Sequence, residues 1–479
     1  MPARLPILRK TPFAIDPNPL HGACTAHAGL AAPSRAFRAL GLPGSCEANL
    51  GGLKSRRRGL VAGQSVESLV LLHAAGGDCM DDIERLRGDE GLTRILGYAA
   101  PASRSLKDFL ELFHEVARVT QAKEQAAAQQ RLAFIPEPTA ALEGLGRVLT
   151  HSARQTAAAM EPQRFGTVDL DGTIIPSEKQ AALWTYQGLK GYQPLVAVWA
   201  ETGLVLADEF RDGNVPGDMA PLSCARAGFA ALPDTVTHYA FRGDTACYEG
   251  HLLNWLDDPQ RPGGPQGRIE FAVGAPVQDG LLSSMKQVRE EAWGTLQVEA
   301  DGTQRQWAEL DYVPSARYEQ KGAWPRRYIG IRLLKAQGNL FADGSDRHYH
   351  ALLTNRTETG GLVVDWHRQK AGTVEQVHDQ LKNGLGGGHL PSGKFGANAA
   401  WFRITCIAHN VLLAVRAKWP DATLRTAHMK RLRFTIFQVS GRVVRDRRKI
   451  WLRLAASREW IAQLTQLFAA FPLPTQATG

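Results

Sequence analysis

Two aspartates, Asp169 and Asp171, stand one residue apart in the stretch FGTVDLDGTIIPS, which covers residues 165–177. The stretch is typical of a β-strand, in which successive side chains point to opposite faces. We therefore expect the two carboxylates to share one face of the strand, with Val168 and Leu170 on the other. Acids held in this way can serve the hydrolysis of small phosphate esters or metal-dependent cleavage of a phosphodiester, and the elements that follow must decide between the two.

A second acid that could join them is Asp244, which ends a strand predicted for residues 236–244. Before it, the runs YQPLVAVWA and LVLADEFRDG enclose the sequence Glu-Thr-Gly at 201–203, and this pattern predicts a β-hairpin with a glycine-containing turn. Helices are predicted for residues 219–232 and 247–256. The hairpin implies that the first strands of this region are antiparallel.

One hypothesis is a phosphatase of the haloacid-dehalogenase type, whose first motif has the form Asp-x-Asp-Gly-Thr. Gly243 and Asp244, followed by Glu249, resemble the acidic motif of that family. The hypothesis also requires a lysine ahead of the acidic motif and a parallel sheet. The chain has no lysine between Lys190 and Lys286, and the predicted hairpin is antiparallel. The phosphatase therefore stays as the alternative hypothesis.

A third acid that could join Asp171 and Asp244 is Glu375, in a helix predicted for residues 362–383. Lys382 follows Glu375 at two helical turns, so the two side chains share one helix face. Three carboxylates suit magnesium, because Mg²⁺ prefers oxygen ligands and retains several waters. Two such ions about 3.5–4 Å apart can activate an attacking water or hydroxyl and stabilise the leaving oxygen.

Other polar residues near these acids have more than one interpretation. Asp169 either orients a metal ligand or is only a polar residue of a half-buried strand. Asp379, one turn after Glu375, could replace it or face solvent. The pair Glu290–Glu291 precedes a strand rather than a long helix and is less suited to be the third acid. His378 is expected on the surface.

The stretch WHRQKAGTVEQVHDQLK resembles the signature helix of the DDE transposases of bacterial insertion sequences, in the group with a Tyr-x2-Arg-x3-Glu-x6-Lys signature. The motifs DLDGT and RGD at the two aspartates, and LPSGKFGANAAWFRITCIAHN after the helix, also match. The resemblance covers roughly residues 65–455. It implies an α/β fold with a ribonuclease-H-like (retroviral-integrase-like) mixed-sheet core, a β-rich insertion and a preceding all-α domain.

The same resemblance assigns catalysis and metal binding to Asp171, Asp244 and Glu375, with two Mg²⁺ ions that Mn²⁺ can replace. It implies that double-stranded DNA is the partner, both as the terminal inverted repeats of an insertion sequence and as target DNA. The implied reaction is cleavage and strand transfer, by a dimer in the synaptic complex, in the bacterial cytoplasm and at the nucleoid when bound to DNA. A DNA-binding relative whose catalytic core has decayed is a further alternative.

The signature departs from the family at position 371, where alanine stands in place of the expected arginine. The nearest basic residues are Lys370 and Arg368, and the tyrosine position is taken by a neighbouring histidine or tryptophan. Lysine keeps the charge of arginine but not its bidentate grip on phosphate. We expect Lys370, Arg368 and the signature lysine Lys382 to contact DNA.

The order of predicted elements divides the chain into five parts. A mainly helical segment, 1–160, is expected to bind DNA, and 161–275 forms the first part of the catalytic core. A β-rich insertion follows at 276–360, and the core resumes at 361–420 with the glutamate helix. The last part, 421–479, is basic and expected to contact DNA.

The basic end of the chain dominates the charge balance of this sequence of 479 residues, whose formal net charge is +9. The segment 425–453 is dense in arginine and lysine, and Asp446 is its only acid. A solvated basic face is one interpretation, but together with the catalytic motifs the pattern favours DNA phosphate binding. The residues we expect to make these contacts are Arg431, Arg433, Arg445, Arg447 and Arg448.

Cysteine usage and hydropathy disfavour other classes. None of the six cysteines forms a Cys-x-x-Cys pair, so neither a zinc site nor a disulfide scaffold is expected. No stretch approaches the roughly 20 apolar residues of a membrane span, and no membrane partner is expected.

Overall fold

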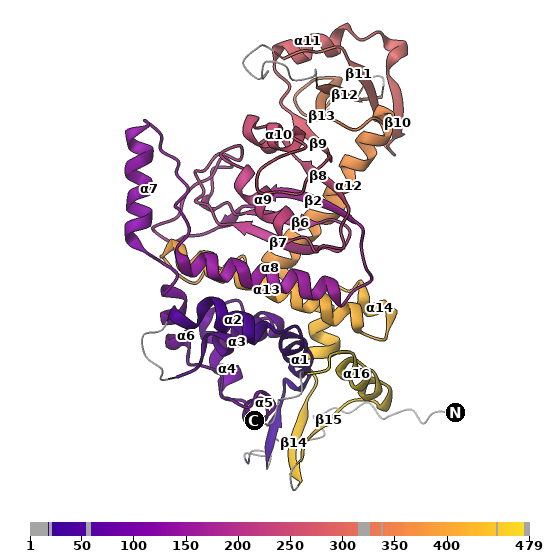
Figure 1. The fold of residues 1–479 in the computed structure, drawn as a ribbon. Coiled ribbons are helices and arrows are strands. Elements are labelled where there is room, and N and C mark those ends of the chain that lie inside the picture. The colour runs from indigo at the N-terminus through magenta and orange to yellow at the C-terminus, as the bar shows by residue number, and fades with distance from the viewer. Residues whose placement is uncertain are drawn as a thin grey trace, which may run out of the picture.

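The computed structural model describes residue 18 and residues 22–53, 59–314, 326–336, 339–446 and 449–473. Two long helices, α8 (Ala140–Ala158) and α13 (Phe395–Lys418), pack side by side across the middle of the molecule. Shorter helices lie on one side of this pair and a large sheet lies on the other (Figure 1). Among the described helices, none is long and apolar enough to cross a membrane.

Seven shorter helices come from the first part of the chain. They are α1 (Ala31–Ala39), α2 (Leu42–Leu50), α3 (Ala62–Ala75), α4 (Ile83–Arg87), α5 (Glu90–Leu96), α6 (Ser103–Glu111) and α7 (Val116–Ala128). Polar caps set some of the boundaries. Asp89 accepts a hydrogen bond from the Leu92 amide at the start of α5, and Thr139 accepts one from the Leu142 amide at the start of α8.

The N-terminal helices and the C-terminal helix α13 share one hydrophobic core. Leu69 of α3 and Leu145 of α8 belong to the same buried cluster as Trp401 and Ile404 of α13. The helical segment 1–160 is therefore not separated from the rest of the chain, because α13 supplies much of the apolar surface that these helices bury. Sequence order alone cannot reveal a helix that returns from so far along the chain.

The large sheet has nine strands in the order β10-β11-β12-β13-β9-β8-β2-β6-β7. Their bounds are β2 (Phe165–Gly172), β6 (Leu195–Trp199), β7 (Leu204–Glu209), β8 (His238–Gly243), β9 (Ile269–Ala275), β10 (Gly294–Val298), β11 (Gln304–Leu310), β12 (Arg327–Leu334) and β13 (Arg347–Thr354). β2, β6 and β7 are successively antiparallel, whereas β2, β8 and β9 are parallel. The hairpin β6–β7 turns at Gly203, whose φ of +73° favours glycine.

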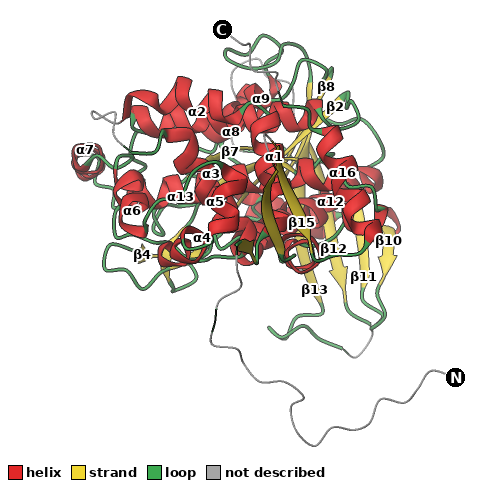
Figure 2. Ribbon diagram, turned by 90° about the horizontal axis from the view of Figure 1, so that it is seen from below, coloured by secondary structure: helices red, strands yellow, loops and turns green. Residues whose placement is uncertain are grey.

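The β-rich segment extends this sheet rather than forming a sheet of its own. β13 pairs antiparallel with β9, so that Ala351 lies opposite Ala275, and β12, β11 and β10 follow in turn. Seen from below, β10 to β13 lie side by side at one margin of the molecule (Figure 2). The segment predicted as a β-rich insertion, 276–360, thus continues the central sheet beyond β9.

Helices cover the two faces of the sheet differently. α9 (Leu222–Ala231) packs on the face that carries Val168 and Leu170, and Gly228 allows close approach to Ala197. α12 (Gly360–Asp379) crosses the opposite face and contacts β2, β6, β8, β9 and β11. The helix predicted for 362–383 therefore begins slightly earlier and continues as one π-helical turn over Gln380–Gly384.

The remaining elements lie at the margins. α10 (Gly250–Asp257) and α11 (Asp279–Gln287) flank β9, and a small sheet is formed by β3 (Ile175–Pro176), β5 (Lys190–Tyr192) and β4 (Leu183–Trp184). The C-terminal part contains α14 (Ala422–Arg425), α15 (Met429–Leu432), the hairpin β14 (Gly441–Asp446) and β15 (Lys449–Leu454), and α16 (Arg458–Ala470). β1 (Ala23–Thr25) adds an antiparallel strand to β14.

Candidate active site

Asp171 and Asp244 come together at the ends of two neighbouring strands. β2 and β8 are parallel, and their last registered pair is Leu170 with Gly243. Since the next residue on each strand is an acid, the two carboxyl groups meet at one edge of the strand pair. Desolvation raises the pKa of the Asp244 carboxyl, and the negative charge of Asp171 raises it further, while Lys370 opposes the shift.

Lys370 faces these acids from α12. Its side chain is buried, and its Nζ lies 3.1 Å from Oδ1 of Asp171. Burial lowers the pKa of Lys370, but the charges of Asp171 and Asp244 outweigh burial and raise it overall. Lys370 thus stays protonated and compensates the acids. That Lys370 contacts DNA stays a prediction, and the face of α12 that carries this lysine packs on the sheet beside the acids.

Two histidines of α12 also face this region. His367 is one of the two candidates for the tyrosine position of the signature, and the expectation that His378 lies on the surface is wrong, because α12 packs this face on the sheet. His378 is buried, with Nδ1 3.7 Å from Oδ2 of Asp171, and its Nε2 has no hydrogen-bond partner among the residues that the structure describes. Burial, with the charges of Lys382 and Lys370, lowers the pKa of His378 to about 3, so the ring is neutral at pH 7. His367 hydrogen-bonds through Nε2 to the Gly243 carbonyl oxygen, 2.9 Å away.

The periodicity of α12 contains the signal that would have found these residues. Lys370, Val374 and His378 are spaced at four-residue steps, and all three are buried. Four-residue steps keep side chains on one helix face. The sequence prediction took Glu375 as the residue that faces the acids. Glu375 is exposed and lies on a different face of the helix from these three buried residues.

Glu375 lies at the rim of this arrangement. Its side chain is exposed, and among the described residues it has no hydrogen bond or ion pair. It stands three residues before His378, so it is a helical neighbour of the residue that approaches Asp171. Within the described residues, the ligand atoms of Asp171, Asp244 and Glu375 do not all lie within 4.8 Å of one another.

The other residues predicted on this helix have local partners. Asp379 is exposed and accepts a hydrogen bond from Nδ2 of Asn383 at 2.8 Å. Lys382 is half-buried and directs Nζ to the carbonyl oxygen of Ile174, 3.4 Å away. Arg368 is exposed and donates to Oε1 of Gln297 on β10, at 3.1 Å. Arg368 and Lys382 therefore remain accessible enough to be DNA contacts.

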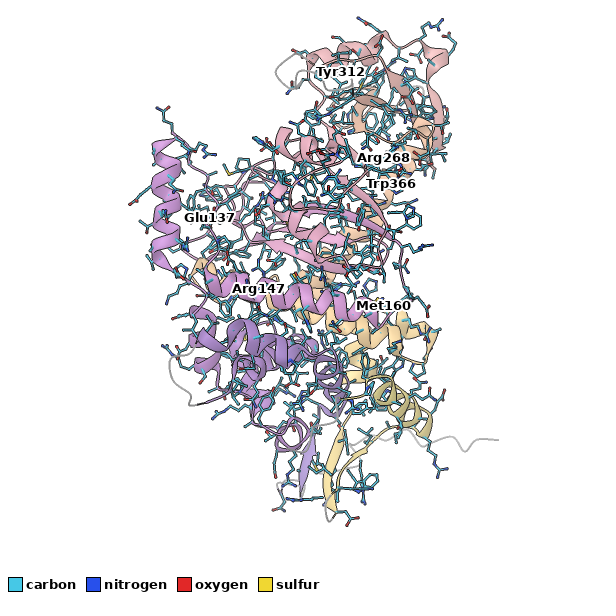
Figure 3. All side chains as sticks on the ribbon, in the orientation of Figure 1. Glu137, Arg147, Met160, Arg268, Tyr312 and Trp366 are labelled. Carbon is cyan, nitrogen blue, oxygen red and sulfur yellow. The ribbon has the colours of Figure 1, made fainter. Side chains whose placement is uncertain are left out.

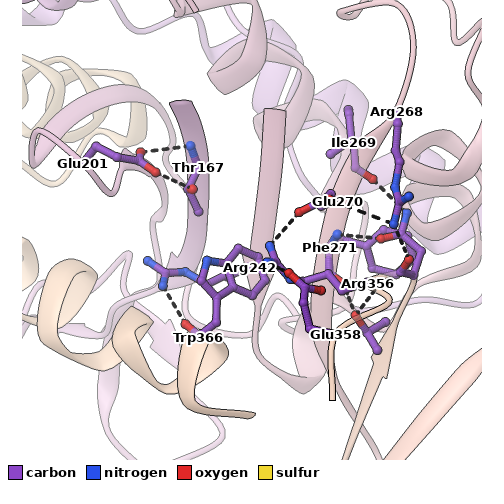
Figure 4. A network of polar contacts seen from close by, with 12 residues as sticks. Thr167, Glu201, Arg242, Arg268, Ile269, Glu270, Phe271, Arg356, Glu358 and Trp366 are labelled. Atoms are coloured by element: carbon purple, nitrogen blue, oxygen red, sulfur yellow. Dashed lines mark hydrogen bonds and ion pairs between the residues drawn. The ribbon is translucent and has the colours of Figure 1, made fainter. Parts of the chain in front are cut away.

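Asp169 is fully buried and forms a bidentate ion pair with Arg242 of β8. Nε and Nη2 of Arg242 lie 2.6 and 2.8 Å from the two carboxylate oxygens. Thr373 of α12 donates its hydroxyl to the same carboxylate. Arg242 also donates through Nη1 to the carbonyl oxygen of Trp366, at 2.7 Å (Figure 4). This network, which we call the Asp169 clamp, ties α12 to both acid-bearing strands.

Arg356 extends the Asp169 clamp on the side of the β-rich segment. The guanidinium of Arg356 lies 4.2 Å from the ring centroid of Trp366, and that of Arg242 lies 5.2 Å from it. Arg356 pairs in turn with Glu270 of β9, at 2.7 Å, and with Glu358. Figure 3 shows Trp366 at the level where α12 passes the sheet. The two cation–π contacts hold the first half of α12 in place.

A cavity of about 610 Å³ opens beside Asp244. Gly172 and Gln193 line it from the core, and Tyr312 lines it from the β-rich segment. Asp244 itself keeps contact with solvent, and its Oδ1 accepts a hydrogen bond from the Ala246 amide at 3.0 Å. A ligand in the cavity would therefore reach this carboxylate directly.

The donor groups fit hard divalent cations. Two carboxylates converge beside a solvent-connected cavity, and carboxylate oxygens with water are what Mg²⁺ requires. Another acidic group, formed by Asp78, Cys79 and Asp82, has ligand atoms within 4.8 Å of one another but is exposed. There, Asp82 accepts hydrogen bonds from the amides of Asp78 and Cys79, so it stabilises a turn.

The basic residues predicted near the C-terminus differ in accessibility. Arg431 and Arg445 are exposed. The Arg433 guanidinium instead donates to three backbone carbonyl oxygens, of His73, Ala74 and Gly384, and its contact with DNA stays a prediction. Its role is to join α3 to the turn after α12. The other two predicted contacts lie outside the described residues; these are Arg447 and Arg448.

Two acids that meet at the ends of adjacent parallel strands can serve metal-dependent phosphodiester cleavage, and the family comparison identifies the class of protein. Residues 34–473 match the family described as transposase DDE domain group 1. The chain therefore belongs to this family and is a DNA transposase. The phosphatase hypothesis finds no support, because β2 and β6 are antiparallel.

The chain is also similar to one solved transposase assembly. The cryo-EM structure of a piggyBac transposase synaptic complex with hairpin DNA aligns with a TM-score of 0.41 and 10% sequence identity. The alignment covers 95% of this chain and 87% of that one. No curated protein gives a significant match.

Proposed function

We propose that this transposase binds the terminal inverted repeats of a bacterial insertion sequence and catalyses DNA cleavage and strand transfer. In this proposal Asp171, Asp244 and Glu375 hold two Mg²⁺ ions, which Mn²⁺ can replace. The observation that carries the proposal is the convergence of Asp171 and Asp244 at the ends of adjacent parallel strands, in a chain of the DDE transposase family.

A ribonuclease-H-like core is part of the proposal. Its support is the strand order β7-β6-β2-β8-β9, in which the first three strands are antiparallel and the last three are parallel. In this arrangement the first acid lies near the end of the central strand and the second follows the neighbouring one. The proposed third acid, Glu375, belongs to α12, the helix that crosses the face of the sheet where the two aspartates lie.

Each residue of the site has a proposed role in cation binding. Asp171 and Asp244 bind cations through their carboxylates, and Glu375 completes the set by turning its exposed side chain toward them. The bound ions would activate the attacking water or hydroxyl and stabilise the leaving oxygen. Lys370 would have to move away from Oδ1 of Asp171 for a cation to bind that oxygen, because its ammonium group would repel the cation.

The proposed partners are duplex DNA at both the element ends and the target, and a second copy of the chain in the synaptic complex. The bacterial cytoplasm, and the nucleoid during DNA binding, is the proposed location. Arg368 and Lys382 are proposed DNA contacts near the acids, because Arg368 of α12 is exposed and Lys382, in the π-helical turn that follows α12, is only half-buried. Arg431, which is exposed, is a proposed contact further along the chain.

The decisive test is a cleavage assay on DNA that carries the element ends. We expect strand cleavage with Mg²⁺ or Mn²⁺ and none with EDTA, and no turnover of small phosphate esters. Asp171→Asn and Asp244→Asn should each abolish cleavage and leave DNA binding intact. Specific binding without any cleavage by the natural chain would instead identify a relative whose catalytic core has decayed.

A further inference from the structure

The hairpin β14–β15 projects from the end of the molecule opposite the β10–β13 margin of the sheet (Figure 1). Its two faces follow from its register. Arg442 lies opposite Arg453, Val444 opposite Trp451, and Asp446 opposite Lys449. Residues directly opposite in an antiparallel pair share a face, so these three pairs form one face, which we call the outer face.

The other face points toward the body of the protein. Val443 is buried, and Leu454 packs against the helical core. Arg445 lies on this face, opposite Ile450, beyond the part that is covered. By contrast, Arg442, Arg453, Lys449 and Trp451 on the outer face are all exposed.

The outer face carries an excess of positive charge. Arg442 and Arg453 are directly opposite each other, and like charges in that position destabilise a strand pair. Among the described residues, neither arginine has a carboxylate partner. Of the described residues on this face, Asp446 is the one acid, and it lies opposite Lys449. An anionic ligand would relieve this repulsion.

We propose that the outer face of β14–β15 binds the phosphates of duplex DNA, with Arg442 and Arg453 as the central pair and Trp451 packed beside them. The proposal deepens the proposed function by assigning a surface away from the catalytic acids to the same DNA. It rests on charge complementarity, since duplex DNA presents a dense row of phosphates. A protein partner fits less well, because the cores of protein interfaces are depleted in charged residues.

The register also provides a control for this pair. Sequence reasoning selected Arg445, whereas the register places it on the face opposite to Arg442 and Arg453. Arg445 is therefore a matched control: it is exposed, basic and on the same strand as Arg442, but faces the other way. Trp451 offers a second control, because it is on the outer face and uncharged.

The test is a titration of a labelled duplex of arbitrary sequence in EDTA, so that cleavage does not contribute, across a series of KCl concentrations. Each phosphate contact contributes about −0.9 to the slope of log K against log salt. Arg442→Ala with Arg453→Ala should therefore reduce the steepness by about 1 to 2. Arg445→Ala should leave the slope near that of the natural chain, and Trp451→Ala should weaken binding without changing the slope.

The proposal is overturned if the double variant keeps the natural slope while its melting curve shows an intact fold. It is equally overturned if Arg445→Ala flattens the slope as much as the double variant does. A change in self-association measured by sedimentation, with an unchanged DNA slope, would assign the face to a second copy of the chain. Because binding is measured without metal, failure of cleavage does not affect this outcome.

Discussion

Arg242 and Asp169 form a buried bidentate ion pair two residues ahead of Asp244 and Asp171, with Nε and Nη2 of Arg242 at 2.6 and 2.8 Å from the carboxylate oxygens. Because the side chains alternate along each strand, the pair lies on the same face as the two acids. Thr373 and the Trp366 carbonyl attach α12 to the pair. The position of α12 over the acids therefore depends on a buried ion pair that does not itself include the two acids.

Breaking this pair should be costly to stability. Asp169→Asn leaves the Arg242 charge buried without its partner, and removing one member of a buried pair costs roughly 3–5 kcal/mol. Urea denaturation measures the free energy of unfolding. The matched control is Asp379→Asn at an exposed position, which should stay within about 0.5 kcal/mol of the natural chain. A loss below about 1 kcal/mol in Asp169→Asn would contradict the clamp.

Removing the Lys370 charge should strengthen cation binding at the acids. In Lys370→Met the ammonium no longer competes for Asp171, so Mn²⁺ affinity measured by calorimetry without DNA should rise on the order of tenfold, or about 1.4 kcal/mol. Lys370→Arg keeps the charge and should not show this gain. Equal Mn²⁺ affinity in all three proteins would mean that Lys370 and the cation occupy different places.

The third acid can be identified by paired substitutions on α12. Glu375→Gln keeps the shape of the side chain and removes its charge, so we expect cleavage to be lost and DNA binding to be retained. Asp379→Asn should cost far less, because that carboxylate already pairs with Asn383. A gel cleavage assay beside a binding titration gives both quantities. Inactive Asp379→Asn with active Glu375→Gln would move the third ligand by one helical turn.

Acid should destabilise the protein through buried neutral histidines such as His409. Burial lowers its pKa to about 4, and its Nε2 lies 2.9 Å from the Gly203 carbonyl oxygen. Because the folded pKa lies below the unfolded value of about 6.5, the unfolded chain binds more protons between these pH values. Stability is then complete above about pH 6.5 and falls toward pH 4.

The magnitude of this loss is at most about 1.4 kcal/mol per pH unit for one histidine. His409→Gln should therefore flatten the dependence of the unfolding free energy on pH between about 6.5 and 4. His389→Gln, at an exposed position, serves as the control and should leave the dependence unchanged. Parallel pH curves for the natural chain and His409→Gln would show that burial of this ring is not linked to folding.

The local pattern of the chain was sufficient to place the two aspartates. Strand alternation predicts that Asp169 and Asp171 share a face, and both do face α12, through Thr373 and Lys370. The hairpin of β6 and β7 follows from its glycine turn, because Gly203 adopts a positive φ there. Such features depend on residues close together in sequence, whose geometry the backbone alone restricts.

Only tertiary packing could decide which face of a helix or strand is buried against the rest of the protein. A helix repeats every 3.6 residues whichever side is buried, so the sequence of α12 did not reveal that Lys370 and His378, rather than Glu375, would face Asp171. The same ambiguity affects a strand: the sequence did not reveal that Arg442 and Arg453 share one face of their hairpin while Arg445 lies on the other. Packing against distant elements removes the ambiguity, because only one face can bury its apolar side chains against them.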